Sequence, residues 1–583
     1  MTTNLDHIDT LHTQIAVVGG GGAGLRAALA AAESGTQVTL LCKGLAARSG
    51  ATAMAGSSIQ SGGQMQDTPE LAFEDIRREG RYLGDENLIQ AMVVDAAGCV
   101  EDLLRYGVKF LKDENNDLQY FPAPGLSRPR NVVIKGNGFG MGIGLRLALE
   151  KWESAMLLDD MLVFRLFIDH GRICGLLALD MRRGRPLLVI AQAVVLATGG
   201  YQELWLWTDA EPGLTGDGAY LAYQAGADLV DLEMMQFYPT AFCYPPQAMG
   251  GTVGYEDLLH PDGCGGYLLN GKGNIIQEPA SQLPLRDELM MRIFAEIDDG
   301  NTAPHGGVYI DLRRSKKSRE EMMNVLGEQM LVPYNNLADF GIDILETPLE
   351  VKPFTHYLMG GVRINEHAES NVAGLFAAGE AGGNVQGANR ISGNGLAESQ
   401  VFGKRAGQRA AAYAAEIRNR QPESGTVQAA IGELLAFKEE KSRPIRPVTL
   451  KRAIKHIMNE HVNHRRDAKG LQAALQSFAE LREEALPNLQ VLAGGDIFNY
   501  EWQEAVEVQA MLGLAELVAA SALAREESRG HHIRRDHPET RPEQCRHVLA
   551  SKKSQDGYQI QHEPVVRVRP LPDNKGQESE GGA

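Results

Sequence analysis

The most constraining feature of the sequence is a run of glycines near its start, in the segment VVGGGGAGL at residues 17–25. A short apolar run at 14–18 leads into the glycines, and an Ala-rich stretch of helical composition covers residues 25–32. A second apolar run follows at 38–42, after Gly35 has ended the predicted helix. The order strand, turn, helix, strand predicts a βαβ unit.

The glycines have the spacing G-x-G-x-x-G, at Gly19, Gly21 and Gly24. In a βαβ unit the first glycine permits the tight turn, and the second lets the backbone approach a pyrophosphate at the helix N-terminus. The third lets the helix pack closely on the strand. We therefore predict a dinucleotide site; a glycine-rich turn without a ligand is the alternative.

The second predicted strand ends in Cys42-Lys43, where a nicotinamide dinucleotide site usually has Asp or Glu. A carboxylate there accepts hydrogen bonds from a ribose, whereas the ammonium group of Lys43 can only donate them. The sequence therefore indicates a dinucleotide arrangement other than the usual one for NAD.

Composition narrows the class of protein. The chain has 583 residues, 43% of them hydrophobic, and a net charge of −18, so it has material for several cores and lacks the basic balance of a nucleic-acid coat. It has no run of 18 apolar residues and no secretory signal, so we expect no membrane span. Its six cysteines form no CxxC pair, which predicts reduced thiols in a cytoplasmic protein and no metal site.

Further along the chain, residues 194–197 read as a buried strand followed by TGG, and residues 241–351 are mixed, with a helical stretch at 286–296. The pattern becomes helical from about 431 to 528. We expect the last stretch, 546–583, to be a frayed C-terminal tail.

Nine motifs occur in an order that identifies a family. They are GGGGAGLRAAL, KGLAARSGATAMAG, ATGGY, TGDG, QFYPT, LRDE, HYLMGGV, GLFAAGEAGGNVQGANRISGNGLAES and EESRGHHIRRDHP. Over roughly residues 14–545 the chain resembles the flavoprotein subunits of succinate dehydrogenase and fumarate reductase, whose relatives include L-aspartate oxidase and adenylylsulfate reductase.

The resemblance implies an α/β fold with three parts. A Rossmann-like FAD-binding domain would comprise residues 1–240 and 352–430. An α+β capping domain would be inserted at 241–351, and a helical C-terminal domain would cover 431–545, before the tail.

The resemblance also assigns the FAD site. Gly19, Gly21, Gly24 and Lys43 would contact the adenosine half, and the segment from Ser49 to Gly56 would run beside the flavin. Asp217 and Glu380 would hold the FAD, Gly395 and Leu396 would offer backbone N–H groups to the pyrimidine end, and Arg390 would lie at both cofactor and substrate. Without a cofactor, Asp217 would be a turn residue and Glu380 a helix-start residue.

Many membrane-bound members of the family attach FAD covalently to the His of R-S-H-T. The corresponding residues here are Arg48, Ser49, Gly50 and Ala51, so no imidazole is present at that position. We expect FAD to be bound non-covalently.

Three cationic residues match the family's substrate motifs: Arg286 in LRDE, His356 in HYLMGGV and Arg390 in GANR. The resemblance makes Arg286 the proton shuttle, His356 a substrate ligand and Arg390 the clamp on a substrate carboxylate. Guanidinium forks match carboxylates, and positive charge stabilises a developing carbanion. Purely structural roles are the alternatives: a surface ion pair for Arg286, a core histidine for His356 and a cap on the following turn for Arg390.

The substrate side also departs from the family. Tyr238 replaces the His of Q-Y-H-P-T, Gln386 replaces the His before G-A-N-R, and TVGYEDLLHPDGC replaces T-E-G-C-R-G-E. Tyr255 or Glu256 could stand in for the Thr-Glu pair. We count Tyr238 and Glu256, with His356 and Arg390, as predicted substrate ligands.

The leading hypothesis is a fumarate reductase or succinate dehydrogenase type of flavoprotein. Hydride would pass between flavin N5 and a C4-type dicarboxylate, with Arg286 as the proton shuttle. The alternatives are an L-aspartate oxidase-like enzyme, a reductase of another unsaturated carboxylate and a non-catalytic assembly protein. The family's respiratory members imply a separate iron–sulfur subunit. They also imply a cytoplasmic location, which partner subunits could make peripheral on the inner membrane face.

Overall fold

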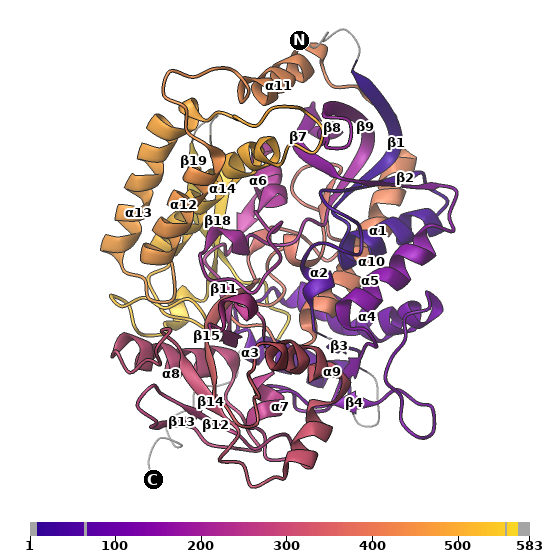
Figure 1. Ribbon diagram of the computed structural model, residues 1–583. Helices are drawn as coiled ribbons and strands as arrows, with labels where there is room; N and C mark the ends of the chain where they lie inside the picture. The colour runs from indigo at the N-terminus through magenta and orange to yellow at the C-terminus, as the bar shows by residue number, and fades with distance from the viewer. Residues whose placement is uncertain (1–7, 57, 63–66, 253, 554–556, 570–583) are drawn as a thin grey trace.

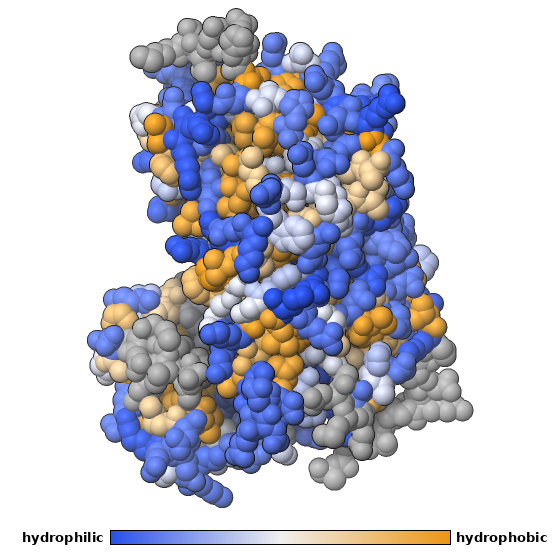
Figure 2. Space-filling model, turned by 90° about the vertical axis from the view of Figure 1, so that its right-hand side faces the viewer, coloured by the Kyte–Doolittle hydropathy of each residue, from blue (hydrophilic) through white to orange (hydrophobic). Residues whose placement is uncertain are grey.

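The computed structural model describes residues 8–56, 58–62, 67–252, 254–553 and 557–569. Figure 1 shows three regions: an α/β body that carries the N-terminus, a lower α+β part, and a layer of helices along the left side. The notch in the surface of Figure 2 lies between the upper body and the lower part.

The α/β body is built on a seven-stranded sheet in the order β6-β2-β1-β9-β8-β7, with β17 also paired to β9. The strands are β1 (Asp9–Val18), β2 (Val38–Cys42), β6 (Ala155–Asp159), β7 (Met161–Asp169), β8 (Arg172–Asp180), β9 (Arg185–Leu196) and β17 (Leu375–Ala377). The pairs β1–β2, β1–β9, β2–β6 and β9–β17 are parallel, whereas β7, β8 and β9 pair antiparallel. The predicted βαβ unit is present, and its first strand begins five residues earlier than the apolar run.

Helices pack around this sheet. They are α1 (Gly22–Glu33), α2 (Ala51–Met54), α3 (Pro69–Glu79), α4 (Glu86–Arg105), α5 (Asn137–Leu149), α6 (Asp217–Gln224) and α10 (Asn394–Glu416). A small sheet lies beside them, formed by β3 (Ser58–Gln60), β5 (Asn131–Val133) and β4 (Tyr120–Phe121). Helices α1 and α10 pack against each other, although they lie far apart in the sequence, because both are rich in Ala and Gly and allow close approach.

The lower part is a five-stranded antiparallel sheet in the order β11-β15-β14-β12-β13. Its strands are β11 (Met235–Phe242), β12 (Tyr267–Leu269), β13 (Ile275–Gln277), β14 (Val308–Asp311) and β15 (Leu349–Leu358), and its helices are α7 (Tyr255–Leu259), α8 (Arg286–Asp298) and α9 (Arg319–Asp339). Its hydrophobic core is separate from that of the body. The predicted junctions at 240/241 and 352 both fall inside long strands, β11 and β15, that join the two parts.

The C-terminal helices are α11 (Ser424–Ala436), α12 (Pro447–His461), α13 (Ala468–Glu480) and α14 (Tyr500–Ala524). Helix α14 packs against α12, α13 and α6. Its buried side chains, such as Trp502, Met511 and Leu514, belong to the same core as the sheet of the body. Among the described residues, α14 is the one helix with the length and hydropathy of a membrane span, and 78% of its most apolar window is buried inside the protein.

The prediction of a frayed end beginning at residue 546 is wrong. Strands β18 (Arg546–Lys552) and β19 (Tyr558–Pro564) pair antiparallel, and β18 also pairs with β10 (Leu229–Val230), which pairs in turn with β16 (Gly361–Val362). Val548, Leu549 and Ala550 are fully or almost fully buried. These apolar residues give the C-terminal segment a place in the fold, because they complete a sheet with strands from distant parts of the chain.

Candidate active site

One large cavity of about 2150 Å³ connects the body with the lower part. Ligand sites typically measure ~300–1,000 Å³, so this cavity has room for an extended cofactor and a small substrate together. It is lined by the glycine turn after β1, the segment 49–56, the start of α10 and the region around Arg286 and Arg390. The residues predicted from distant motifs therefore meet around a single space.

The glycine turn has the geometry expected of a dinucleotide fingerprint. Gly19 has φ +116°, and a Cβ atom there would lie 2.1 Å from the carbonyl oxygen of Ala197. A Cβ on Gly24 would lie 1.8 Å from the carbonyl oxygen of Gly19, so only glycine permits this helix-to-strand packing. Gly21 is the N-cap of α1, and a Cβ there would meet only the Oγ1 of Thr52, at 3.4 Å. Gly19 and Gly21 line the cavity, whereas Gly24 acts through packing.

A second helix N-terminus meets the same cavity. Gly393, with φ +84°, is the N-cap of α10, and Gly395 and Leu396 in the first turn line the cavity. The first-turn N–H groups of a helix have no acceptor within the helix, so they are ready to bind a ligand's oxygen or nitrogen atoms. In the segment 49–56, which also lines the cavity, a Cβ on Gly50 or on Gly56 would meet nothing within 4 Å. These open backbones and donors fit FAD.

Lys43 lies in an ion-pair cluster at the far end of the cavity. Its Nζ is 2.6 Å from Asp217, 2.9 Å from Glu507 of α14 and 2.9 Å from the Oγ1 of Thr215. Burial would lower the pKa of Lys43, but Asp217 and Glu507 together raise it above its usual value. Lys43 and Asp217 are therefore paired with each other, and both line the cavity; contact with FAD remains a prediction for each.

Glu380 and Ser49 also line the cavity. The Glu380 carboxylate accepts hydrogen bonds from the backbone N–H of Leu358, at 3.0 Å, and from Gln202. Burial raises the pKa of Glu380 to about 7. Ser49 donates to the carbonyl oxygen of Leu45, at 2.9 Å. Glu380 is thus fixed by the protein itself, and its role toward FAD remains a prediction.

The three predicted cationic residues come together at the other end of the cavity. Arg286, the first residue of α8, donates from Nη1 to the Oε1 of Gln236, at 3.3 Å. Arg390 donates from Nε to the same oxygen, at 3.2 Å. The Nη2 of Arg390 lies 2.8 Å from the Nε2 of His356. Residues from β11, α8, β15 and the loop before α10 thus form one cluster.

The hydrogen bonds of His356 fix its tautomer. A guanidinium can only donate, so the Nε2 of His356 accepts from Arg390 and its Nδ1 carries the proton. The Nδ1–H then donates to the Oδ2 of Asp209, at 2.8 Å. Burial, with the nearby charges of Arg390 and Arg286, lowers the pKa of His356 despite the opposing effect of Asp209. The ring is held neutral and oriented.

The two arginines differ in their charge partners. Arg286 has Glu256 at 3.6 Å, and the negative charge of Glu256 helps to raise the pKa of Arg286 against the effect of burial. Within the described part of the chain, no carboxylate lies within 4 Å of the Arg390 guanidinium. Burial and the charge of Arg286 lower the pKa of Arg390 to about 10. An anion in the cavity would therefore relieve an uncompensated buried charge.

Tyr238 and Glu256 complete this end of the cavity. The hydroxyl of Tyr238 donates to the Oε2 of Glu256, at 3.3 Å. The Tyr238 ring lies 5.0 Å from the Arg286 guanidinium and 5.1 Å from the His356 ring. The Tyr255 side chain instead donates to the carbonyl oxygen of Pro284 in the core of the lower part. Of the two candidates for the family's Thr-Glu pair, Glu256 therefore faces the cavity.

Two residues that organise the cluster were missed in the sequence. Gln236 joins both arginines through one oxygen; it lies in the QFYPT motif, two residues before Tyr238. Asp209 orients His356 from a loop 147 residues earlier and lies in no recognised motif. Among the described residues, no group of three or more His, Cys, Asp or Glu is placed to hold a metal ion.

Comparison with known proteins decides the family. A model of the FAD binding domain matches residues 14–396, and a model of the fumarate reductase flavoprotein C-terminus matches residues 451–575. The chain belongs to the succinate dehydrogenase and fumarate reductase flavoprotein family. It is an FAD-dependent oxidoreductase, as its motifs predict.

Individual relatives agree with this assignment over nearly the whole chain. One subunit of the fumarate reductase (CoM/CoB) of Methanothermobacter marburgensis is 34% identical, over 93% of this chain and 98% of the relative. The fumarate reductase flavoprotein subunit of Mycobacterium tuberculosis is 30% identical, over 96% and 98%. Among solved structures, E. coli quinol fumarate reductase superposes with a TM-score of 0.87 at 27% identity, over 97% of this chain and 98% of that chain. These matches confirm the fold class of the α/β body with its helical C-terminal region.

Proposed function

We propose that this protein is a flavoprotein subunit that interconverts an unsaturated and a saturated C4-type dicarboxylate, as fumarate reductases and succinate dehydrogenases do. The observation that carries the proposal is the buried Arg390, which lacks a carboxylate partner among the described residues and lies beside Arg286 in the cavity of the FAD cradle. A dianionic substrate supplies the missing negative charge, and guanidinium forks bind carboxylates in a bidentate manner.

Each residue of the cluster has a distinct task. Arg390 holds one substrate carboxylate, and His356 lies beside it. Because the Nδ1–H of His356 donates to Asp209, the fixed ring acts by accepting from Arg390 and keeping that guanidinium in place. Arg286, held by Gln236 and Glu256, gives a proton to the substrate carbon in reduction and takes it back in oxidation. Tyr238 packs against Arg286 and His356 and lines the same end of the cavity. The flavin, when bound, supplies or accepts the hydride.

FAD attachment is proposed to be non-covalent, because Gly50 lies where an attachment site needs an imidazole. Acid precipitation of the pure protein tests this directly. We expect all yellow flavin in the supernatant; flavin that stays with the denatured protein would contradict the proposal.

A separate electron-transfer subunit is proposed as the redox partner. Five of the six cysteines are buried and the sixth is partly buried, and they are unpaired. Solved relatives include the Sdh1 complex of Mycobacterium smegmatis and E. coli quinol fumarate reductase, which supports a partner subunit. We propose that the partner carries iron–sulfur clusters and that the protein is cytoplasmic, held at the membrane face through its partners.

The proposed activity is tested by reoxidation of the flavin. The holoprotein is reduced without oxygen, mixed with fumarate, and followed through the flavin absorbance near ~450 nm. We expect rapid return of the oxidised band with fumarate, and no hydrogen peroxide from L-aspartate in air. The matched control Arg183→Gln, which removes an exposed arginine from the Asp180 pair, should behave as wild type. A flavin that fumarate leaves reduced would contradict the proposal, and peroxide release with aspartate would favour an amino-acid oxidase.

A further inference from the structure

A second, much smaller cavity lies behind the two arginines. Its volume is about 10 Å³, close to the ~10–15 Å³ that one water molecule requires. The residues around it include Glu79, Glu256, Arg286, Asn389 and Arg390. The cavity has room for about one water, and we call it the one-water chamber. Two carboxyl groups and two guanidinium groups are among the groups that line it.

Glu79 reaches this chamber from outside the lower part. It is the last residue of α3, and it lines both the large cavity and the one-water chamber. It is 4% exposed. Its Oε1 accepts from the Nε of Arg78, at 3.1 Å, whereas its Oε2 is buried without a hydrogen-bond partner among the described residues. A buried carboxyl oxygen without a partner is costly, so a partner in the chamber would stabilise it.

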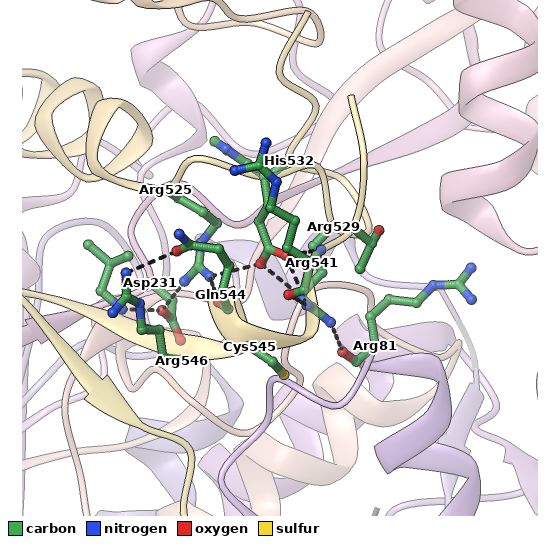
Figure 3. Close-up of polar contacts among 12 residues, drawn as sticks. Arg81, Asp231, Arg525, Arg529, His532, Arg541, Gln544, Cys545 and Arg546 are labelled. Carbon is green, nitrogen blue, oxygen red and sulfur yellow. Dashed lines mark hydrogen bonds and ion pairs between the residues drawn. The ribbon is translucent and has the colours of Figure 1, made fainter. Parts of the chain in front are cut away.

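The backbone around Glu79 is held firmly. The N–H of Ala388 donates to the carbonyl oxygen of Gly80, at 2.9 Å. Arg529, from the C-terminal segment, donates to the carbonyl oxygen of Arg81, at 2.7 Å (Figure 3). Gly125 covers the side chain, because a Cβ there would lie 2.9 Å from the Cγ and Cδ of Glu79. The carboxyl group therefore keeps its place between the two cavities.

Several charges surround Glu79. Arg78 lies in the same helix, Arg81 lies in the turn after it, and Asp287 belongs to α8. The chamber is also lined by Glu256, Arg286 and Arg390. Burial raises the pKa of Glu79 to about 7, against the opposing effect of Arg78 and Arg81. Glu256, the other carboxylate at the chamber, already binds the Tyr238 hydroxyl and faces Arg286. Glu79 is thus the carboxyl group with a free oxygen and the ability to carry a proton near neutral pH.

We propose that Glu79 returns the proton to Arg286 through one water in this chamber; the inference rests on the proposed dicarboxylate reduction. When Arg286 has given a proton to the substrate carbon next to the one that receives hydride, its guanidine is neutral. The chamber water gives it a proton and takes one from the Glu79 carboxyl group. Glu79 then regains a proton from the large cavity beside Arg78, whose side chain is 49% exposed. Oxidation of the saturated dicarboxylate runs the same transfers in reverse.

The test compares Glu79→Gln with a matched control, Glu398→Gln. Glu398 is also buried, and burial raises its pKa to about 7, but it binds Tyr357 and Gln386 and lines neither cavity. The rate of fumarate reduction and of succinate oxidation is measured from pH 5.5 to 9. In wild type, reduction needs protonated Glu79 and falls above about pH 7, whereas oxidation needs its carboxylate and rises through the same pH.

In Glu79→Gln we expect kcat to fall at least ~10-fold, since general acid–base groups contribute ~10²–10⁴-fold. KM should stay within about threefold of wild type, and both pH limbs should disappear. Glu398→Gln should keep both limbs, and flavin content confirms that each variant is folded. Wild-type rate and limbs in Glu79→Gln would overturn the inference alone. Wild-type protein without either limb would also overturn it, even if the variant failed to fold, and wild-type protein inactive with both substrates would overturn the proposed function as well.

Discussion

Two buried arginines of this protein have opposite surroundings. Arg525, after α14, is 1% exposed and lies 2.9 Å from Asp231, 2.6 Å from Glu233 and 3.3 Å from Glu527. Figure 3 shows it between Asp231 and the backbone of Gln544. Arg390 is 7% exposed and has a glutamine, a histidine and a carbonyl oxygen around it.

The difference shows in the pKa of each arginine. At Arg525 the carboxylates outweigh burial and raise the pKa above its usual value. At Arg390 burial and the neighbouring Arg286 lower it to about 10. A buried arginine that the fold itself neutralises joins parts of the structure, here the C-terminal segment and the strand region before β11. A buried arginine without such compensation is a binding site for an anion.

The largest effect is expected at the proton shuttle. Arg286→Ala removes the group that moves the proton, so turnover with fumarate should fall by about 10²–10⁴-fold. The FAD cradle lies elsewhere, and the protein should stay yellow with normal flavin content. Arg286→Lys tests whether charge alone suffices, and we expect its activity to remain at least ~10-fold below wild type. Near-full activity of Arg286→Ala would contradict the shuttle role.

Arg525 should show the converse behaviour, a loss of stability rather than of chemistry. Arg525→Leu removes a cation from three buried carboxylates. Asp231 keeps His547 and Glu527 keeps Arg529, but Glu233 loses its ion pair, which should reduce the free energy of unfolding by about 3–5 kcal/mol. Thermal unfolding followed by circular dichroism measures this, with exposed Arg183→Leu as the control. An unchanged Tm would mean that Arg525 does not join the C-terminal segment to the body.

A smaller effect on catalysis is expected at Asp209, the residue that orients His356. Asp209→Asn replaces a charged acceptor of the Nδ1–H with a neutral one, and a hydrogen bond to a charged group is worth about 1.5–3 kcal/mol. Steady-state kinetics should show kcat/KM for fumarate lowered by about 10- to 100-fold. Thr208→Ala, next to it in the loop, is the control. Equal loss in both variants would point to loop packing instead of histidine orientation.

The smallest effect concerns pH and stability. Burial raises the pKa of Glu380 and of Glu398 to about 7, above the ~4.3 of an unfolded chain. The folded protein therefore holds more protons than the unfolded chain between these values, and stability is lost as pH rises from about 4.5 to about 7. The Tm of the flavin-free protein should be a few degrees higher at pH 5.5 than at pH 8. Glu380→Gln with Glu398→Gln should flatten this dependence.

Motifs predicted the cores of the fold and the reacting groups. Local patterns predicted the glycine turn, the strand–turn–helix–strand order of β1, α1 and β2, and the three cationic positions. The structure brings these motifs to one cavity. The strands β10 and β16 have two residues each, too few for a pattern. Strand β18 pairs with β10 and, over its whole length, with β19, so the segment expected to be a tail forms part of a sheet.

The supporting residues of the site could not be read from local patterns. Asp209, Gln236 and Glu79 act on groups that lie far away in the sequence, 147 positions for Asp209 and 154 for Gln236. Nothing in their neighbourhood sets them apart from ordinary loop, strand or helix residues. Their roles arise from tertiary packing, which decides which polar side chains are buried together.

The central claim is that the buried Arg390 binds a carboxylate of the substrate. Ligand binding tests this claim most directly. Fumarate, which oxidised flavin cannot reduce, is titrated into oxidised holoprotein, and the change in the flavin spectrum gives Kd for wild type and for Arg390→Gln. Loss of one partner of a buried charge pair costs about 2–5 kcal/mol, so the variant should bind at least ~30-fold more weakly while keeping its flavin. Equal affinity in the two proteins would contradict the account, because the uncompensated charge would then play no part in substrate binding.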